Sequence, residues 1–70
     1  MTTIVAPMPG TILEVLIRIG DEVVEDQELL ILEAMKMENP ICAPCDGRIR
    51  ELTVREKDTV KTDQVLIVLD

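Results

Sequence analysis

The sequence contains no histidine, phenylalanine, tyrosine or tryptophan, and only two cysteines. Without aromatic rings the core must be aliphatic, and the many Val and Ile residues favour sheet over helix. Without histidine the chain lacks the commonest general acid or base and the commonest metal ligand. A chain of 70 residues also has no room for a pocket of ordinary size. We therefore predict that the chain is not an enzyme by itself, with no catalytic residue and no metal site.

Long apolar runs are also missing. No run approaches the roughly 18 residues that a membrane-spanning helix needs, and the N-terminal residues do not resemble a signal peptide. The length is near the lower limit for a chain that folds on its own core, so residues 1–70 are expected to form one domain. We expect a cytoplasmic protein with no direct membrane insertion.

Positive charge is scarce. Fourteen acidic residues against seven basic ones give a net charge of −7, which argues against nucleic acid or an anionic membrane as partner. The excess is uneven: residues 1–33 have a balance of −6, residues 41–70 a balance of −1, and residues 34–40 are neutral. An acidic flank is ordinarily a solubility device, and the alternative is a site for a basic partner surface.

Cys42 and Cys45 have the spacing of a C-x-x-C motif. A zinc site needs about four ligands, and the chain has no other Cys or His. A redox C-x-x-C stands at the start of a helix, where the helix dipole favours the thiolate, whereas a turn and a strand pattern follow Cys45. We interpret the pair as ordinary reduced cysteines.

Short apolar runs separated by Pro, Gly and Asp make up the chain. No segment keeps a 3.6-residue period with helix caps, so no helix is expected. Pro40 cannot donate a hydrogen bond to a neighbouring strand and should lie at a sheet edge or with an outward-facing nitrogen. The expected strands and short extended pieces are 3–6, 11–19, 23–24, 29–33, 37–42, 48–55, 60–61 and 65–69.

The second half of the chain repeats the first. A shift of 37 residues lays residues 4–33 on residues 41–70 with 13 identities in 30 positions. Each half has too few strands to stand alone. Two halves that face one another across a shared aliphatic core predict an all-β flattened sandwich or barrel with a pseudo-two-fold axis. The repeats are joined by the hairpin 34–40, so Lys36 is expected at the end opposite the termini.

The repeat also predicts backbone geometry. Gly10 and Gly47 match, and we expect both to supply conformations that a side chain would block. Gly20 matches Lys57, so Lys57 is expected at positive φ with some strain.

The centre of the chain reads Glu33-Ala34-Met35-Lys36-Met37-Glu38. Methionine is a flexible apolar side chain that fills gaps in cores or lines adaptable binding surfaces. Two methionines that flank a lysine in a turn fit a surface contacted by other proteins better than a core. The alternative is that one of them folds back onto the end of the barrel.

This hexapeptide resembles the biotin attachment motif of biotinyl domains, also called biotin carboxyl carrier proteins. Ala6-Pro7-Met8-Pro9-Gly10, Gly20-Asp21 and Ala43-Pro44 with Asp46-Gly47 resemble the flanking motifs of the same family, so the resemblance covers essentially the whole chain. It implies a barrel-sandwich hybrid, a flattened barrel of two four-stranded antiparallel sheets with the target lysine on an exposed hairpin. It also implies that Lys36 carries biotin through a covalent amide.

The resemblance implies a set of partners. A biotin protein ligase supplies biotinyl-adenylate, and an ATP- and bicarbonate-dependent biotin carboxylase then forms carboxybiotin, although decarboxylases load biotin from a substrate instead. A carboxyltransferase or decarboxylase subunit receives the carboxyl group. Met35 and Met37 match positions that matter for ligase recognition and carrier function. Ala34, Glu33 and Glu38 are further candidates for partner recognition, and the two glutamates fit a plain solvated turn equally.

Three alternatives stay open at this point. A lipoyl domain has the same fold, although it usually has Asp-Lys-Ala or a similar trio in place of Met-Lys-Met, and a carrier of both groups is a further possibility. A structural or interaction domain without cofactor is the third class. The two halves align without a gap, which excludes the protruding thumb of the bacterial acetyl-CoA carboxylase carrier. We expect either a stand-alone carrier subunit or a C-terminal domain of a carboxylase, transcarboxylase or decarboxylase.

Overall fold

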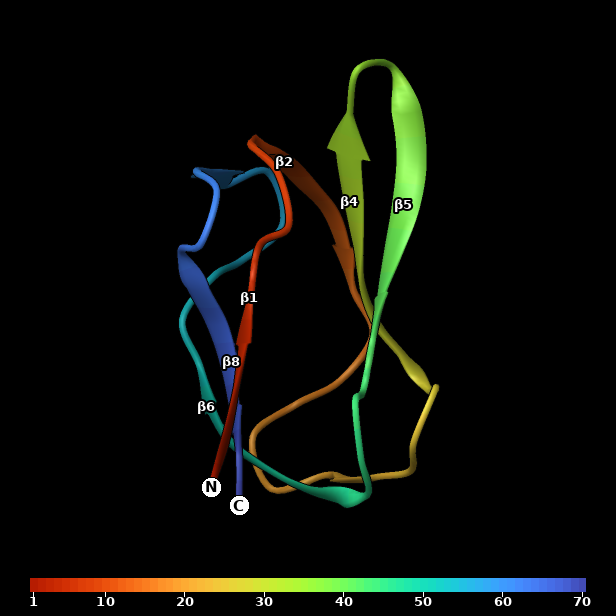
Figure 1. Ribbon diagram of the computed structural model, residues 1–70, viewed down its shortest axis with the longest axis vertical. Helices are drawn as coiled ribbons and strands as arrows, with labels where there is room; N and C mark the ends of the chain where they lie inside the picture. The colour runs from red at the N-terminus through yellow and green to blue at the C-terminus, as the bar shows by residue number, and fades with distance from the viewer.

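A computed structural model describes residues 1–70 as two four-stranded antiparallel sheets without a helix (Figure 1). The prediction of an all-β fold is confirmed, and no helix of the chain could span a membrane. The strands are β1 (Thr2–Val5), β2 (Gly10–Val15), β3 (Glu22–Val23), β4 (Glu28–Ala34), β5 (Met37–Cys42), β6 (Gly47–Leu52), β7 (Thr59–Val60) and β8 (Val65–Leu69).

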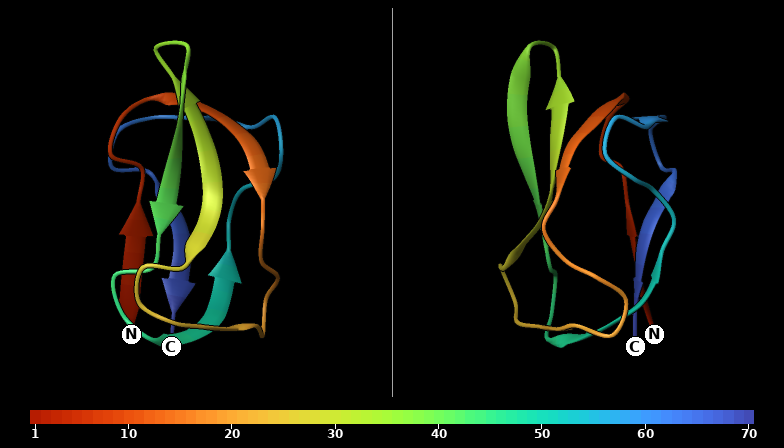
Figure 2. Two further views of the ribbon diagram at one scale, coloured as in Figure 1. Left: turned by 90° about the vertical axis from the view of Figure 1, so that its right-hand side faces the viewer. Right: turned by 180° about the vertical axis from the view of Figure 1, so that it is seen from behind.

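The two sheets have the strand orders β1-β8-β6-β3 and β5-β4-β2-β7. Each sheet therefore takes two strands from each half of the chain. We expected the halves to face one another, and this is wrong in detail because the halves interleave (Figure 2). Strands of different halves pair at four places: β1 with β8, β4 with β5, β3 with β6, and β7 with β2.

Two strands are shorter than predicted. The strand expected over 11–19 ends at Val15, and the strand expected over 48–55 ends at Leu52. Two residues after Val15, the side chain of Ile17 is buried in the core. The chain leaves the sheet at this point because β3 belongs to the other sheet. The same crossing follows β6 and leads to β7.

Identical side chains of the repeat hold equivalent turns. The carboxylates of Asp21 and Asp58 each accept the backbone N–H of the residue three positions earlier, both at 2.9 Å. The side-chain oxygens of Gln27 and Gln64 do the same in the next turn, at 3.1 and 3.0 Å. These identities therefore stabilise the backbone twice over, once in each half.

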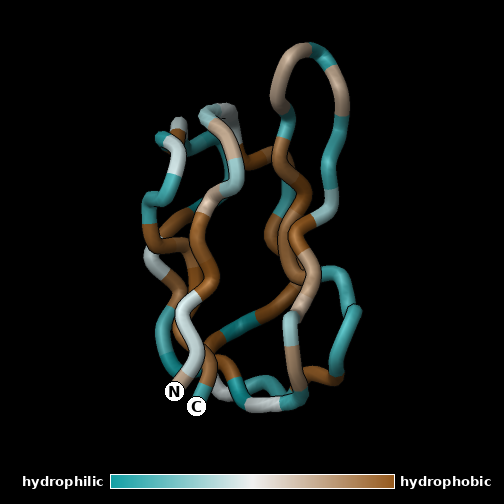
Figure 3. The backbone as a smooth tube through the Cα atoms, viewed as in Figure 1, coloured by the Kyte–Doolittle hydropathy of each residue, from teal (hydrophilic) through white to brown (hydrophobic).

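The space between the sheets is filled by aliphatic side chains from both halves. All 18 buried residues are hydrophobic, so the core holds no polar group that chemistry or ligand binding could use. Leu29 and Leu66, which match in the repeat, are both fully buried. The tube in Figure 3 shows hydrophobic strands along the body and hydrophilic residues in the connections.

The glycines have two different roles. Gly20 has a φ of 97° and its match Lys57 a φ of 75°, so the predicted positive φ at Lys57 is confirmed. Gly10 and Gly47 do not have positive φ, contrary to our expectation of unusual conformations. They allow a close approach of two strands instead: a Cβ at Gly10 would collide with the carbonyl oxygen of Glu33, and one at Gly47 would lie 3.0 Å from the equivalent carbonyl oxygen.

The hairpin between β4 and β5 projects from one end of the molecule, and both termini lie side by side at the other end (Figures 1 and 2). The longest dimension of the molecule is 30 Å. Pro40 lies on β5, an edge strand of its sheet, as predicted.

Candidate functional site

Lys36 lies at the tip of the projecting hairpin. Ala34 pairs with Met37, which leaves only Met35 and Lys36 in the turn. Both have positive φ, 53° and 65°, the combination that a type I′ hairpin turn requires. Most of the connector expected over 34–40 is therefore strand, and the lysine is held by a turn as tight as a hairpin allows.

The backbone of the turn is strained because neither of its two residues is a glycine. Type I′ turns usually contain Asn-Gly or a similar pair, because a side chain with positive φ crowds the backbone. Each left-handed non-glycine residue costs on the order of 1 kcal/mol or more. Strain of this size in a turn with no buried contacts does not help the fold, and such strain is concentrated at functional sites.

The side chains of the two methionines are exposed to solvent. Met35 is 90% exposed and Met37 is 65% exposed, so neither folds back onto the barrel as the alternative interpretation required. Lys36 between them is exposed as well. The hairpin tip is thus an amine flanked by two flexible apolar side chains that contribute little to the core.

The base of the hairpin is rigid. The side chain of Ala34 is only 5% exposed, and the backbone of Gly10 lies directly against the carbonyl group of Glu33. Ala34, which we expected to contact a partner, therefore supports the turn from beneath. Sequence reasoning missed the role of Gly10, and its match with Gly47 in the repeat was the available signal.

Glu33 and Glu38 lie directly opposite one another on β4 and β5, and both are exposed. Neither forms an ion pair with Lys36 or with any other cation. Like charges directly opposite across two strands are destabilising. The fold therefore does not account for this pair of carboxylates beneath the lysine.

The chemistry available at the tip is that of a single amine. A lysine amine attacks only as the free base, because its ammonium form has no lone pair. Its four-carbon stem makes it a suitable point for attachment of a group that must reach away from the protein. The hairpin can thus present an attached group, provided that another protein activates that group and accepts the proton.

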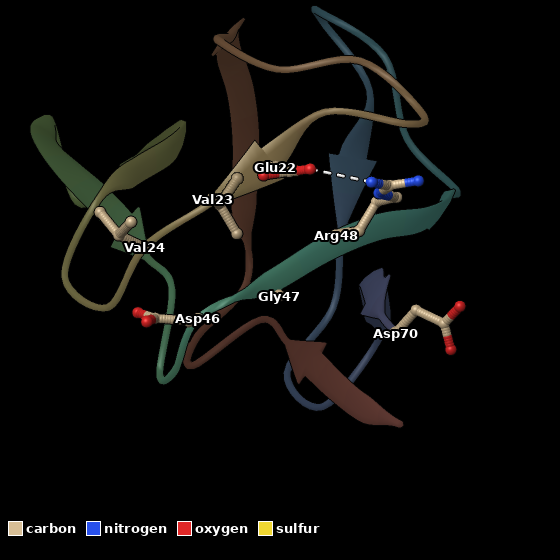
Figure 4. A pocket seen from close by; sticks show the side chains of 7 residues that line it. All are labelled: Glu22, Val23, Val24, Asp46, Gly47, Arg48 and Asp70. Atoms are coloured by element: carbon tan, nitrogen blue, oxygen red, sulfur yellow. Dashed lines mark hydrogen bonds and ion pairs between the residues drawn. The ribbon is translucent and has the colours of Figure 1, made fainter.

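A hollow lies at the opposite end of the molecule, where Asp70, the last residue, is among its lining residues (Figure 4). Its volume is about 450 Å³, so the expectation that the chain has no room for a pocket of ordinary size is wrong by volume. The Glu22–Arg48 ion pair of 2.8 Å crosses one wall. The lining residues are Glu22, Val23, Val24, Asp46, Gly47, Arg48 and Asp70. None of the predicted site residues lines it.

Cys42 and Cys45 are both free thiols. Cys42 is exposed on β5, whereas Cys45 packs against the core and lies 3.7 Å from the hydroxyl oxygen of Thr2. Both cysteines lie away from the hairpin tip, and the chain holds no group of three or more potential metal ligands.

The sequence profile of a family described as "Biotin-requiring enzyme" matches residues 2–69. The chain belongs to this family. Among curated proteins, it is 69% identical over 39 residues to the biotin carboxyl carrier protein of Streptococcus mutans, a match that covers 56% of the chain and 30% of that protein. It is 60% identical over 37 residues to the gamma subunit of methylmalonyl-CoA decarboxylase from Propionigenium modestum, covering 53% of the chain and 28% of that subunit.

Solved structures support the same fold for this biotin-requiring family member. A single-chain, multi-domain long-chain acyl-CoA carboxylase matches 94% of the chain with a TM-score of 0.88 and 30% identity, over 6% of its own length. The urea carboxylase of Kluyveromyces lactis matches 99% of the chain with a TM-score of 0.92 and 22% identity, again over 6% of its length. The chain therefore spans less than a third of each of these relatives.

Proposed function

We propose that the chain is a biotin carboxyl carrier and that Lys36 is its attachment site. The observation that supports this most is the two-residue left-handed turn that holds Lys36 between exposed Met35 and Met37 in a member of a biotin-requiring family. The side chains of the turn contribute no buried contact to the fold. A function that needs one lysine displayed to several enzymes accounts for this turn.

The residues of the chain fit an attached biotin. Lys36, once deprotonated in a biotin protein ligase, attacks the activated carboxyl group of biotinyl-adenylate; an amide forms, adenylate leaves, and the ligase accepts the proton. Bound biotin supplies a ring nitrogen that takes up a carboxyl group at one active site and releases it at another. No hollow adjoins the hairpin, so the chain leaves the ring free on its arm.

The rest of the chain acts as a rigid support. The hairpin base at Ala34 and Gly10 fixes the direction in which Lys36 points. A tethered group reaches an effective local concentration that a free one does not. The support thus lets one cofactor serve two active sites without leaving the protein.

The proposed partners are a biotin protein ligase, a biotin carboxylase, and a carboxyltransferase or decarboxylase subunit. Relatives include both carboxylases and decarboxylase subunits, such as the propionyl-CoA carboxylase alpha chain of Caenorhabditis elegans, 50% identical over 40 residues that cover 57% of this chain and 6% of that one. We propose the cytoplasm as the compartment, because the cytoplasm keeps cysteines such as Cys42 and Cys45 reduced.

Co-expression with a biotin protein ligase tests this function. Wild type and Lys36→Arg are compared by intact mass and by streptavidin binding, with Lys57→Arg as the control. Lys57 is also an exposed lysine in a left-handed turn, so it controls for exposure and backbone geometry. We expect one biotinyl group on wild type and on Lys57→Arg and none on Lys36→Arg. A lipoyl mass, or labelling that persists in Lys36→Arg, contradicts the proposal.

A further inference from the structure

The strands of the two sheets differ in their charged residues. The strands of the hairpin sheet, β5-β4-β2-β7, contain four glutamates and no Lys or Arg. The strands of the other sheet contain two glutamates and two arginines. Both ion pairs of the protein involve those arginines, Arg48 with Glu22 at 2.8 Å and Arg50 with Asp70 at 3.6 Å. No glutamate of the hairpin sheet forms an ion pair.

The four glutamates are exposed on the outer side of the hairpin sheet, around an apolar centre. In β4 the side chains of Leu30, Leu32 and Ala34 point inward, so Ile31 and Glu33 point outward. Ile31 is half-buried and pairs with Glu14. We name this surface the acidic face, which consists of Leu13, Glu14, Glu28, Ile31, Glu33 and Glu38.

The repeat provides an internal control for the acidic face. Leu13, at a bulge in β2, is 38% exposed, and its match is Arg50, at the equivalent bulge in β6. Glu28 matches Val65 at the start of the equivalent strand. The same backbone positions therefore accept opposite side-chain chemistry. The fold does not require an acidic rim and an apolar centre on the hairpin sheet.

Lys36 is the only cation in the strands of this sheet and the turn between β4 and β5. Amide formation at its nitrogen removes that positive charge. The carrier with its cofactor attached therefore has no cation in the strands of this sheet or in its hairpin turn, and Lys57 and Lys61 flank β7 outside them. An uncompensated surface of one sign attracts partners of the opposite sign and accelerates their association.

We propose that the acidic face docks on a basic surface beside the active-site entrance of the biotin carboxylase. This inference rests on the proposed function. The face is continuous with the hairpin through β4 and β5 (Figure 1), so a partner that receives the arm of Lys36 lies next to it. A biotin carboxylase binds a nucleotide and bicarbonate, both anions, and an entrance that attracts anions is rich in Lys and Arg. Its apolar side chains would contact Leu13 and Ile31 at the centre.

The test compares Glu14→Gln with Glu51→Gln. The two glutamates match in the repeat, are both exposed, and stand on opposite sheets, so each variant loses one charge from an equivalent backbone position. Biotinylated proteins are carboxylated by the purified biotin carboxylase component of the native enzyme at low and high salt. We expect the KM of Glu14→Gln to rise roughly two- to fivefold at low salt, the factor for one exposed ion pair, with kcat unchanged and Glu51→Gln like wild type. The difference in KM should vanish near 1 M salt, because salt at that concentration screens exposed charges that lie more than about 3 Å apart.

Leu13→Arg is the second variant, because the matching bulge already holds Arg50 without disturbing the fold. It should raise KM more than Glu14→Gln and leave the melting temperature unchanged. Equal KM values for the Glu14 and Glu51 variants would overturn the docking face, as would an effect confined to the transfer of the carboxyl group to its acceptor. Absence of biotin on the wild type would instead overturn the proposed function, so the two failures are distinguishable.

Discussion

The two ends of the barrel are related by the repeat, yet only the hairpin end carries the predicted attachment lysine between two exposed methionines. At the hairpin end, β4 and β5 are closed by the strained turn of Met35 and Lys36. At the other end, the equivalent pair of β8 and β1 is open, and the termini lie there. Features that the backbone needs occur twice, once at each end. Features that occur once, at the hairpin, are those that the proposed function needs.

The largest effect on stability is expected from substitutions in the aliphatic core that the two halves share. Leu29→Ala and Leu66→Ala should each lower the free energy of unfolding by about 2–5 kcal/mol, because both side chains are fully buried in one core. Urea denaturation of the two variants measures this. Similar losses are the expected result. A large loss in one variant and almost none in the other would show that the halves do not share a core.

The next comparison separates the two ends. Gly10→Ala should lower the free energy of unfolding by about 1–3 kcal/mol, because its Cβ meets a backbone carbonyl oxygen. Gly47→Ala should cost less, since its nearest contact of 3.0 Å needs only a small shift. Both are measured by urea denaturation.

The two glycine variants should also differ in biotinylation. Gly10→Ala displaces the backbone beneath the hairpin, so the rate of labelling by the ligase should fall. Gly47→Ala acts near the termini and should leave that rate unchanged. Equal labelling rates in folded samples of both variants would contradict the role assigned to Gly10 as support of the turn.

The smallest effects concern strain in left-handed residues. Lys57→Gly should leave stability unchanged or raise it by up to about 1 kcal/mol, because glycine relieves the positive φ of 75° while losing entropy on folding. Met35→Gly relieves similar strain but removes an exposed thioether, so labelling should slow. Melting temperatures and labelling rates distinguish the two. A clear drop in melting temperature for Lys57→Gly would contradict the strain assigned there.

Much of the fold follows from the sequence because the residues that are identical in the two halves include those that form the turns. Asp21 and Asp58 cap equivalent turns through their own side chains, and such local chemistry can be recognised without a structure. Lys57 could be placed at positive φ because its partner is Gly20. These predictions needed only neighbouring residues and the shift of the repeat.

The rest depends on contacts between distant residues. The interleaving of the halves is decided by which strands pair, and β3 and β7 are too short for a sequence pattern to show their partners. The close approach at Gly10 involves Glu33, far along the chain. In the sequence, the net charge is −6 over residues 1–33 and −1 over residues 41–70. In the structure, four glutamates without an ion pair lie on the strands of one of the two sheets. The motif predicts Lys36 as the attachment site, but it does not predict the left-handed turn that presents this lysine.

The central claim is that biotin attached to Lys36 carries a carboxyl group from one active site to another. The most direct measurement incubates biotinylated protein with the biotin carboxylase component, ATP and isotope-labelled bicarbonate, and then follows the label bound to the protein. Wild type and Lys57→Arg should acquire label that is lost when the acceptor component is added, and Lys36→Arg should acquire none. Protein-bound label in Lys36→Arg, or none on fully biotinylated wild type, would contradict the account.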